Sequence, residues 1–145
     1  MTHDILFRGK RADDGKWIES SSIKQISSDE IFLLGGRCWI KIVPSTVGQF
    51  AGLTGKNGRK IFEGDILDLS YYMIKYVGVV KFGEYKDFDM TDDYTCGHVG
   101  FYIEIEERYH KRYYVRRDIL FFVSECKVLG NIHDNPELLK GDPNV

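Results

Sequence analysis

The sequence has few cysteines, few prolines and no long hydrophobic run. Its three cysteines, Cys38, Cys96 and Cys126, are an odd number and are widely spaced, which argues against a disulfide scaffold and favours a reducing cytosol. No apolar stretch approaches the roughly 20 residues of a membrane-spanning helix, and the first residues lack the apolar segment of a secretion signal. We therefore expect a cytoplasmic protein without a membrane contact.

The sequence also lacks a strong excess of either charge. A formal net charge of −2 gives no global electrostatic reason to bind nucleic acid or membrane. The charges are nevertheless segregated: residues 84–107 hold eight acidic side chains and one lysine, a net of −7, and residues 108–117 hold five basic side chains and no acidic one. Local polarity of this kind can guide a partner.

Aromatic and glycine residues are plentiful. The aromatic share is 14%, with nine Tyr, nine Phe and 15 Gly, a composition that suits short strands joined by tight turns. No segment is long and periodic enough for a helix between parallel strands. These features indicate a mainly β, antiparallel fold, a small barrel with an N-terminal hairpin extension.

The N-terminal region, which we place at 1–45, contains two predicted hairpins. Asp14-Gly15 separates the first pair of strands and Gly35-Gly36 separates the second, and both dipeptides favour hairpin turns. Between the hairpins we expect a weak strand. The predicted strands are 5–10, 16–19, 23–26, 31–34 and 38–43.

The second region, 46–145, could also form one continuous domain with the first. Lys56-Asn57-Gly58-Arg59 is a candidate type I′ turn, and Glu63-Gly64-Asp65 is a second turn before a strand. Residues 84–98 read as a long acidic loop, and Asn135-Pro136 starts a predicted short C-terminal helix. The predicted strands are 66–69, 76–82, 101–106, 118–123 and 126–132.

Several motifs in this region resemble one protein family. Gln49–Leu53, Asn57-Gly58, Ile61–Ile66 and Gly78–Gly83, together with the closing 128–139 segment, are similar in order and separation to the YopX family of phage and prophage proteins. The resemblance implies an SH3-like barrel portion and a bacterial host cell. The family is functionally uncharacterised, so the resemblance implies no catalytic or binding residues.

Two carboxylates at Glu63 and Asp65 could serve acid–base chemistry or hold a hard cation. The alternative is a structural turn in which Asp65 bonds backbone amides and Gly64 supplies an unusual backbone angle. We favour the turn, with Asn57, Gly58, Glu63, Gly64 and Asp65 as its structural signature. A hydrolase or metal-dependent enzyme using Glu63 and Asp65 is the less favoured alternative, and we expect no catalytic residues.

The basic segment is the strongest candidate for binding. Its cations could neutralise phosphates and its tyrosines could stack on bases, or the cations could pair with Glu104, Glu106 and Glu107 on a neighbouring strand. Both interpretations stay open. The candidate residues for a nucleic acid or another partner are Arg108, Tyr109, Lys111, Arg112, Tyr113, Tyr114, Arg116 and Arg117.

Metal and cofactor sites are not expected. The acidic residues Asp87, Asp89, Asp92 and Asp93 lack the glycine and the closing glutamate of a calcium loop, and Cys96 and His98 lack a second local pair for zinc. We expect a non-enzymatic accessory protein that acts by binding a host or phage protein or by homo-oligomerisation. Nucleic-acid binding through the basic segment is the alternative.

Overall fold

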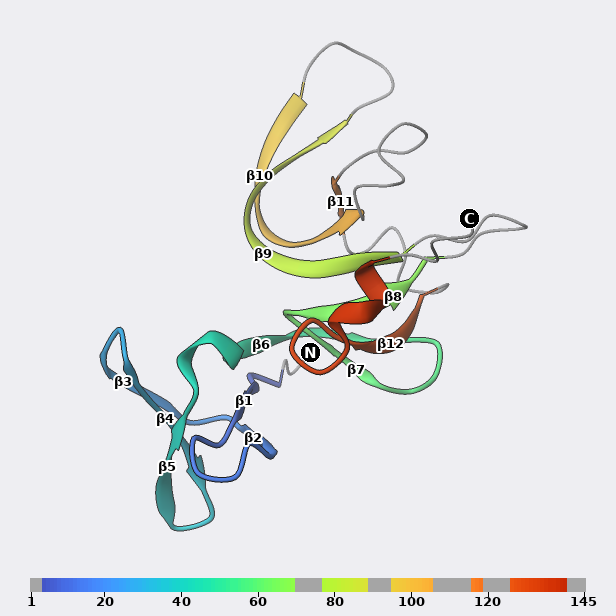
Figure 1. Cartoon of the computed structure of the whole chain (residues 1–145). Helices are drawn as coiled ribbons and strands as arrows, with labels where there is room; N and C mark the ends of the chain where they lie inside the picture. The colour runs from blue at the N-terminus through green and yellow to red at the C-terminus, as the bar shows by residue number, and fades with distance from the viewer. Residues whose placement is uncertain (1–3, 70–76, 89–94, 106–115, 119–125, 141–145) are drawn as a thin grey trace. The chain divides into compact units, whose positions relative to one another are not determined.

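The computed structural model describes residues 4–69, 77–88, 95–105, 116–118 and 126–140, with the side chains of 85–88, 95–98, 105 and 116–118 excepted. The chain divides into two compact units, Met1–Gly52 and Leu53–Val145. The sequence predicted a boundary between residues 45 and 46, and this exact position stays a prediction. Figure 1 shows the strands of both units.

The first hairpin of unit 1 confirms the sequence prediction. Strands β1 (Phe7–Lys10) and β2 (Trp17–Ser20) pair antiparallel, from Phe7 opposite Ser20 to Lys10 opposite Trp17. Gly15 has φ 73° in the connecting turn, a conformation that glycine adopts without steric cost. The first residues of β6 (Gly48–Thr54) pair with the other edge of β1.

The second hairpin is also present, and the weak strand before it completes a three-stranded antiparallel sheet. Its strands are β3 (Ile23–Ser27), β4 (Glu30–Gly35) and β5 (Cys38–Ile42), in the order β3-β4-β5. Gly36, in the β4–β5 turn, has φ 66°. Because side chains alternate between the faces of a strand, Ile31, Leu33 and Ile42 share one face, and all three are buried.

A short 3-10 helix, η1 (Pro44–Thr46), follows β5 and is tied to β1. The buried Thr46 hydroxyl accepts a hydrogen bond from Lys10 N at 2.9 Å and donates one to Val43 O at 2.6 Å. Trp17 is covered by two cations of β1, with the Arg8 guanidinium 4.9 Å and Lys10 Nζ 5.4 Å from its ring centroid. Trp17 is therefore part of the packing of unit 1.

Unit 2 contains a five-stranded antiparallel sheet in the order β11-β10-β9-β8-β12. Its strands are β8 (Asp65–Asp68), β9 (Val77–Phe88), β10 (Thr95–Ile105), β11 (Arg116–Asp118) and β12 (Lys127–Asn131), and the short β7 (Lys60–Phe62) precedes β8. The fully buried side chains that form its core include Ile61, Ile66, Leu67, Val80, Ile103, Cys126 and Val128.

The predicted acidic loop at 84–98 is wrong over most of its length. Strand β9 continues to Phe88 and β10 begins at Thr95, so Asp87 lies in β9 opposite Cys96. Gly83 has φ 154° and lies opposite Gly100, so the strand passes through a conformation that other residues rarely adopt. Sequence reasoning treated this glycine as a strand end. Asp89, Asp92 and Asp93 lie outside the described residues.

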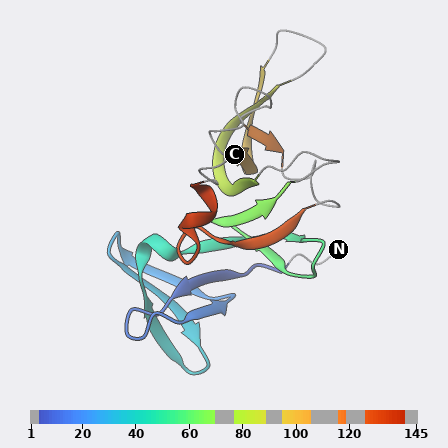
Figure 2. The same ribbon diagram turned by 45° about the vertical axis from the view of Figure 1, so that its right-hand side comes forward.

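The SH3-like barrel is not confirmed. In the described part of unit 2 the strands form an open sheet, with β11 and β12 at its edges. Figures 1 and 2 show β9 and β10 as a long curved hairpin whose far end lies away from β8 and β12. Much of the strand length therefore pairs within this hairpin and does not close a barrel.

The predicted short C-terminal helix is also not confirmed, because the segment forms one 3-10 turn, η4 (Pro136–Leu139). The predicted proline and the acidic residue of the first turn are present, but the Asn135 side chain makes no capping hydrogen bond and only four residues follow the helical path. Among the described residues, no helix has the length and apolar character needed to cross a membrane.

Candidate partner-binding surface

The face of the β3–β4–β5 sheet opposite the buried one carries aromatic and basic side chains. Lys24, Phe32 and Lys41 lie directly opposite one another on the three strands, and Leu34 and Trp39 form the next pair. We call these five residues the Trp39 face. Trp39 is 42% exposed, so a large aromatic ring of this face lies in contact with water.

The cations of the Trp39 face interact with its rings. Lys24 Nζ lies 4.7 Å from the centroid of Trp39 and 5.4 Å from that of Phe32. A cation above a ring within about 6 Å is attracted by the quadrupole of the ring. Among the described residues, no carboxylate lies within 4.0 Å of the ammonium of Lys24 or Lys41. The Trp39 face is therefore both apolar and positively charged.

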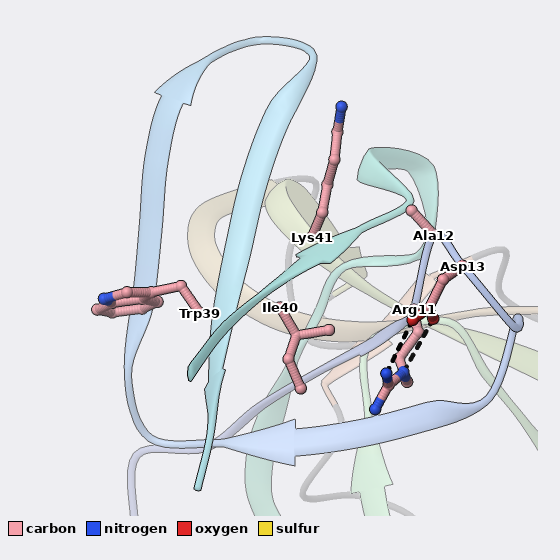
Figure 3. Close-up of a pocket in the computed structure, with 6 residues that line it drawn as sticks. All are labelled: Arg11, Ala12, Asp13, Trp39, Ile40 and Lys41. Atoms are coloured by element: carbon pink, nitrogen blue, oxygen red, sulfur yellow. Dashed lines mark hydrogen bonds and ion pairs between the residues drawn. The ribbon is translucent and has the colours of Figure 1, made fainter. Parts of the chain in front are cut away.

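A shallow cleft of about 460 Å³ borders this face and is lined by Arg11, Ala12, Asp13, Trp39, Ile40 and Lys41. It forms because the chain beyond β1 continues beside β5: Ala12 N donates to Lys41 O at 2.9 Å, and Arg11 forms an isolated bridge with Ile42. Figure 3 shows the Trp39 ring pointing away from the Arg11–Asp13 pair.

Arg11 and Asp13 form a bidentate ion pair in the cleft. The Nε–Oδ1 distance is 3.0 Å and the Nη2–Oδ2 distance is 2.8 Å, and Asp14 Oδ1 lies 3.4 Å from Arg11 Nε. The hydrogen bonds from Arg11 lower the pKa of Asp13 to about 2, and the same contact raises the pKa of Arg11. The charge of Arg11 is therefore compensated within the cleft.

Beside this surface, the outer edge of β3 presents backbone N–H and C=O groups that no described strand pairs with. All five residues of β3 are exposed, with Ile26 at 63%. Ser22 O accepts from Leu34 N at 3.1 Å, so by alternation Ile23 and Gln25 direct their backbone groups outward. Such an edge can pair with another chain.

Unit 2 has an exposed apolar patch of its own. Phe82 on β9 and Phe101 on β10 lie opposite each other and pack edge to face, with ring centroids 5.0 Å apart. Phe82 is 52% exposed, and Val99, one pair further along the hairpin, is 78% exposed. Glu84, directly opposite Val99, is also exposed.

The predicted turn residues Asn57 and Gly58 lie in the β6–β7 loop. Gly58 N donates to Gly55 O at 3.0 Å and Gly58 has φ 78°. The hydrogen-bonded turn therefore spans 55–58, and its last residue, Gly58, has the left-handed conformation. This differs from a type I′ turn centred on Asn57-Gly58. Asn57 Nδ2 donates to Val128 O at 3.1 Å.

The other three turn residues, Glu63, Gly64 and Asp65, connect β7 to β8. Gly64 has φ 90°, and its N–H donates to Val80 O at 2.8 Å. Asp65 is 1% exposed, and its Oδ2 accepts from Phe62 N at 2.8 Å. The carboxylate of Asp65 is therefore turned inward onto the backbone.

The basic segment falls mostly outside the described residues. Only the backbone of Arg116 and Arg117 is described, in β11 opposite Glu104 and Ile103. The carboxylate of Glu104 pairs with Lys81 Nζ at 3.1 Å. The candidate residues outside the described ranges are Arg108, Tyr109, Lys111, Arg112, Tyr113 and Tyr114.

Among the described side chains, no group of three His, Cys, Asp or Glu residues is placed to hold a metal ion. Cys38 is exposed and Cys126 is buried, and desolvation raises the pKa of the Cys126 thiol. The side chains of Cys96 and His98 are outside the description.

Sequence reasoning did not identify the Trp39 face. Its signal is the alternation Cys38-Trp39-Ile40-Lys41-Ile42, in which Ile40 and Ile42 share one face and Trp39 and Lys41 the other. Because the segment was predicted only as a strand, at 38–43, this difference between its two faces was missed.

Comparison with known proteins identifies the family. The model of the YopX protein family matches residues 6–140. The chain belongs to the YopX family. Among solved structures, this YopX-family chain is similar to protein EF1440 from Enterococcus faecalis, with 22% sequence identity over 95% of this chain and 99% of that chain and a TM-score of 0.48. No curated protein matches the chain.

Proposed function

We propose that this YopX-family protein is a phage or prophage accessory protein of the bacterial cytoplasm that acts by binding another protein, without catalysing a reaction. The Trp39 face is the proposed contact surface. The observation that carries the proposal is the 42% exposed Trp39, flanked by Lys24 and Lys41 on a sheet whose other face supplies the core.

An exposed tryptophan on a rigid strand is well suited to anchor a partner. Tryptophan is enriched among the few residues that carry most of the binding energy of an interface, and its burial removes a large apolar area from water. The strand holds the Trp39 backbone in register with Leu34, so little backbone conformational entropy is lost on binding. The adjacent lysines would give the contact a charge preference.

Nucleic-acid binding through the basic segment is a second candidate. The ion pair between Glu104 and Lys81 favours it. Glu104 lies opposite Arg116, but its charge is shared with Lys81, a cation outside the basic segment, and so neutralises that segment less. Charge reversal of Lys111, Arg112, Arg116 and Arg117 should then abolish salt-sensitive retention on single-stranded DNA or RNA. Unchanged retention would remove this candidate.

The enzyme alternative at Glu63 and Asp65 receives no support from the geometry. Asp65 is 1% exposed and bonds the Phe62 amide, an arrangement typical of a structural turn. An SH3-like arrangement of the complete unit 2 stays a proposal, to be tested by an experimental structure that includes the segments between its strands.

Affinity capture from the bacterial host tests the proposed function. Wild type, Trp39→Ala and the control Ile5→Ala, which removes a 62% exposed side chain outside the sheet, would be compared with and without nuclease. A specific protein captured by wild type and Ile5→Ala but not by Trp39→Ala, regardless of nuclease, supports the proposal. Equal capture by Trp39→Ala would overturn it, and loss of capture on nuclease treatment would favour the nucleic-acid candidate.

A further inference from the structure

We infer that a partner of the Trp39 face is a second copy of this chain, which contacts it through an exposed apolar patch on the β9–β10 hairpin. The inference rests on the proposed function, because it takes the Trp39 face as the contact surface and specifies the occupant. The contacting residues on the hairpin are Phe82, Glu84, Val99 and Phe101, which we call the hairpin patch.

The hairpin patch continues an apolar stripe that begins in the core of unit 2. Val80 lies opposite Ile103, and both are 0% exposed. Phe82 and Phe101 form the next pair on the same face, followed by Glu84 opposite Val99. Exposure rises along this stripe to 52% at Phe82 and 78% at Val99, so apolar side chains extend beyond the part of the sheet that buries them. Contiguous exposed apolar surface of this kind is typical of interaction sites.

The two surfaces have opposite charge. Glu84 is exposed within the hairpin patch, and no described cation lies within ion-pair distance of its carboxylate. The Trp39 face carries Lys24 and Lys41, with no described carboxylate in ion-pair distance of either ammonium. Each surface thus combines two aromatic rings with an uncompensated charge that the other surface would neutralise. Complementarity of this type selects the partner and the orientation of a contact.

The Trp39 face and the hairpin patch are different surfaces, so the contact between copies is heterologous. A heterologous contact leaves one copy of each surface open at the ends of an assembly, which either closes into a ring or grows into a longer chain. The inference therefore predicts concentration-dependent association, and it predicts that salt weakens this association by screening the charges.

Sedimentation of the full chain at increasing concentration, in low and high salt, tests this inference. Wild type should associate, and raising the salt from about 50 mM to about 500 mM should weaken the association. The double variant Lys24→Glu, Lys41→Glu and the single variant Glu84→Lys should each weaken it about tenfold or more, equivalent to about 1.4 kcal/mol. The control Lys16→Glu reverses an exposed charge at the β1–β2 turn and should associate as wild type does.

Two combinations make the test specific. A chain carrying Lys24→Glu, Lys41→Glu and Glu84→Lys together should regain association, because both surfaces have exchanged their charges. An equimolar mixture of the Lys24→Glu, Lys41→Glu variant with the Glu84→Lys variant should also regain association, with the two variants alternating. The two reversed surfaces are complementary to each other, and so are the two unaltered surfaces.

Three results would overturn the inference: a wild-type monomer up to about 100 μM, association that is unchanged by the charge reversals, or failure of the triple variant to recover. Circular dichroism melting would verify that each variant is folded, and the salt dependence of wild type needs no variant. If wild type is a monomer while Trp39-dependent capture of another protein persists, the inference fails and the proposed function stands.

Discussion

The ammonium of Lys24 on β3 lies 4.7 Å from the centroid of the Trp39 ring on β5, with β4 between the two strands. The same ammonium lies 5.4 Å from the Phe32 ring on β4. One side chain therefore contacts all three strands on the exposed face of the sheet. This arrangement holds the Trp39 ring in place where no core packing covers it, as the proposed contact surface requires.

Replacing Lys24 by methionine should lower the free energy of unfolding by about 0.5–1 kcal/mol, because an exposed cation–π contact contributes about that much. Methionine keeps an unbranched apolar chain and removes the charge. Urea unfolding monitored by circular dichroism would measure the change, and Lys16→Met at the β1–β2 turn is the matched control. A loss of equal size in both variants would show that the position of the charge over the rings is unimportant.

Asp13 should titrate at about pH 2, below its usual 3.8, because Arg11 hydrogen-bonds its ionised form. Since the pKa is lowered on folding, the stabilisation by this pair is fully present above the unfolded value and is lost as the pH falls through about 2. NMR titration of the Asp13 carboxyl carbon would measure the midpoint. Arg11→Gln should move the midpoint upward towards 3.8, and an unchanged midpoint would contradict the assignment of the cause.

Local turn chemistry made much of unit 1 predictable from the sequence. Asp14-Gly15 and Gly35-Gly36 each specify a backbone that few other residues adopt, and the strands on both sides pair as expected. Asp65 was expected to bond backbone amides, because a carboxylate after a glycine turn can reach the nearby N–H groups, and it accepts from Phe62 N.

Features that depend on distant contacts were not predictable in the same way. Gly83 was read as a strand end, but pairing with β10 carries β9 through it, and a single strand contains no information about that partner. The Trp39 face was missed because the sequence of β5 alone does not show which of its sides meets the core. The predicted barrel is not confirmed by the described strands. The sequence could not predict closure, because strand alternation specifies strands and not the order in which they close a sheet.

Gly78→Ala should destabilise the protein by about 1–3 kcal/mol through overpacking. A Cβ at position 78 would lie 2.5 Å from Ile103 Cγ2, 2.9 Å from Leu69 Cδ1 and 3.1 Å from Glu104 O, and the last of these is backbone that cannot rotate away. Thermal unfolding would report the loss.

Gly100→Ala is the matched control for Gly78→Ala. Gly100 lies on the paired strand β10, and a Cβ there would meet nothing within 4 Å, so the substitution should be neutral or slightly stabilising through the unfolded chain. Equal destabilisation by the two substitutions would indicate that strand flexibility, and not close packing at Gly78, explains the effect.

Asp65→Ala should lower the free energy of unfolding by about 1–3 kcal/mol, because it leaves the buried Phe62 N–H without this acceptor. The Oδ2–N distance is 2.8 Å and the residue is 1% exposed, so water cannot readily replace the carboxylate. Asp65→Asn keeps a side-chain oxygen of the same reach and should lose less stability, as measured by urea unfolding. If Asp65→Asn and Asp65→Ala lower the free energy of unfolding equally, then the negative charge of Asp65 stabilises the turn and the hydrogen bond to Phe62 alone does not.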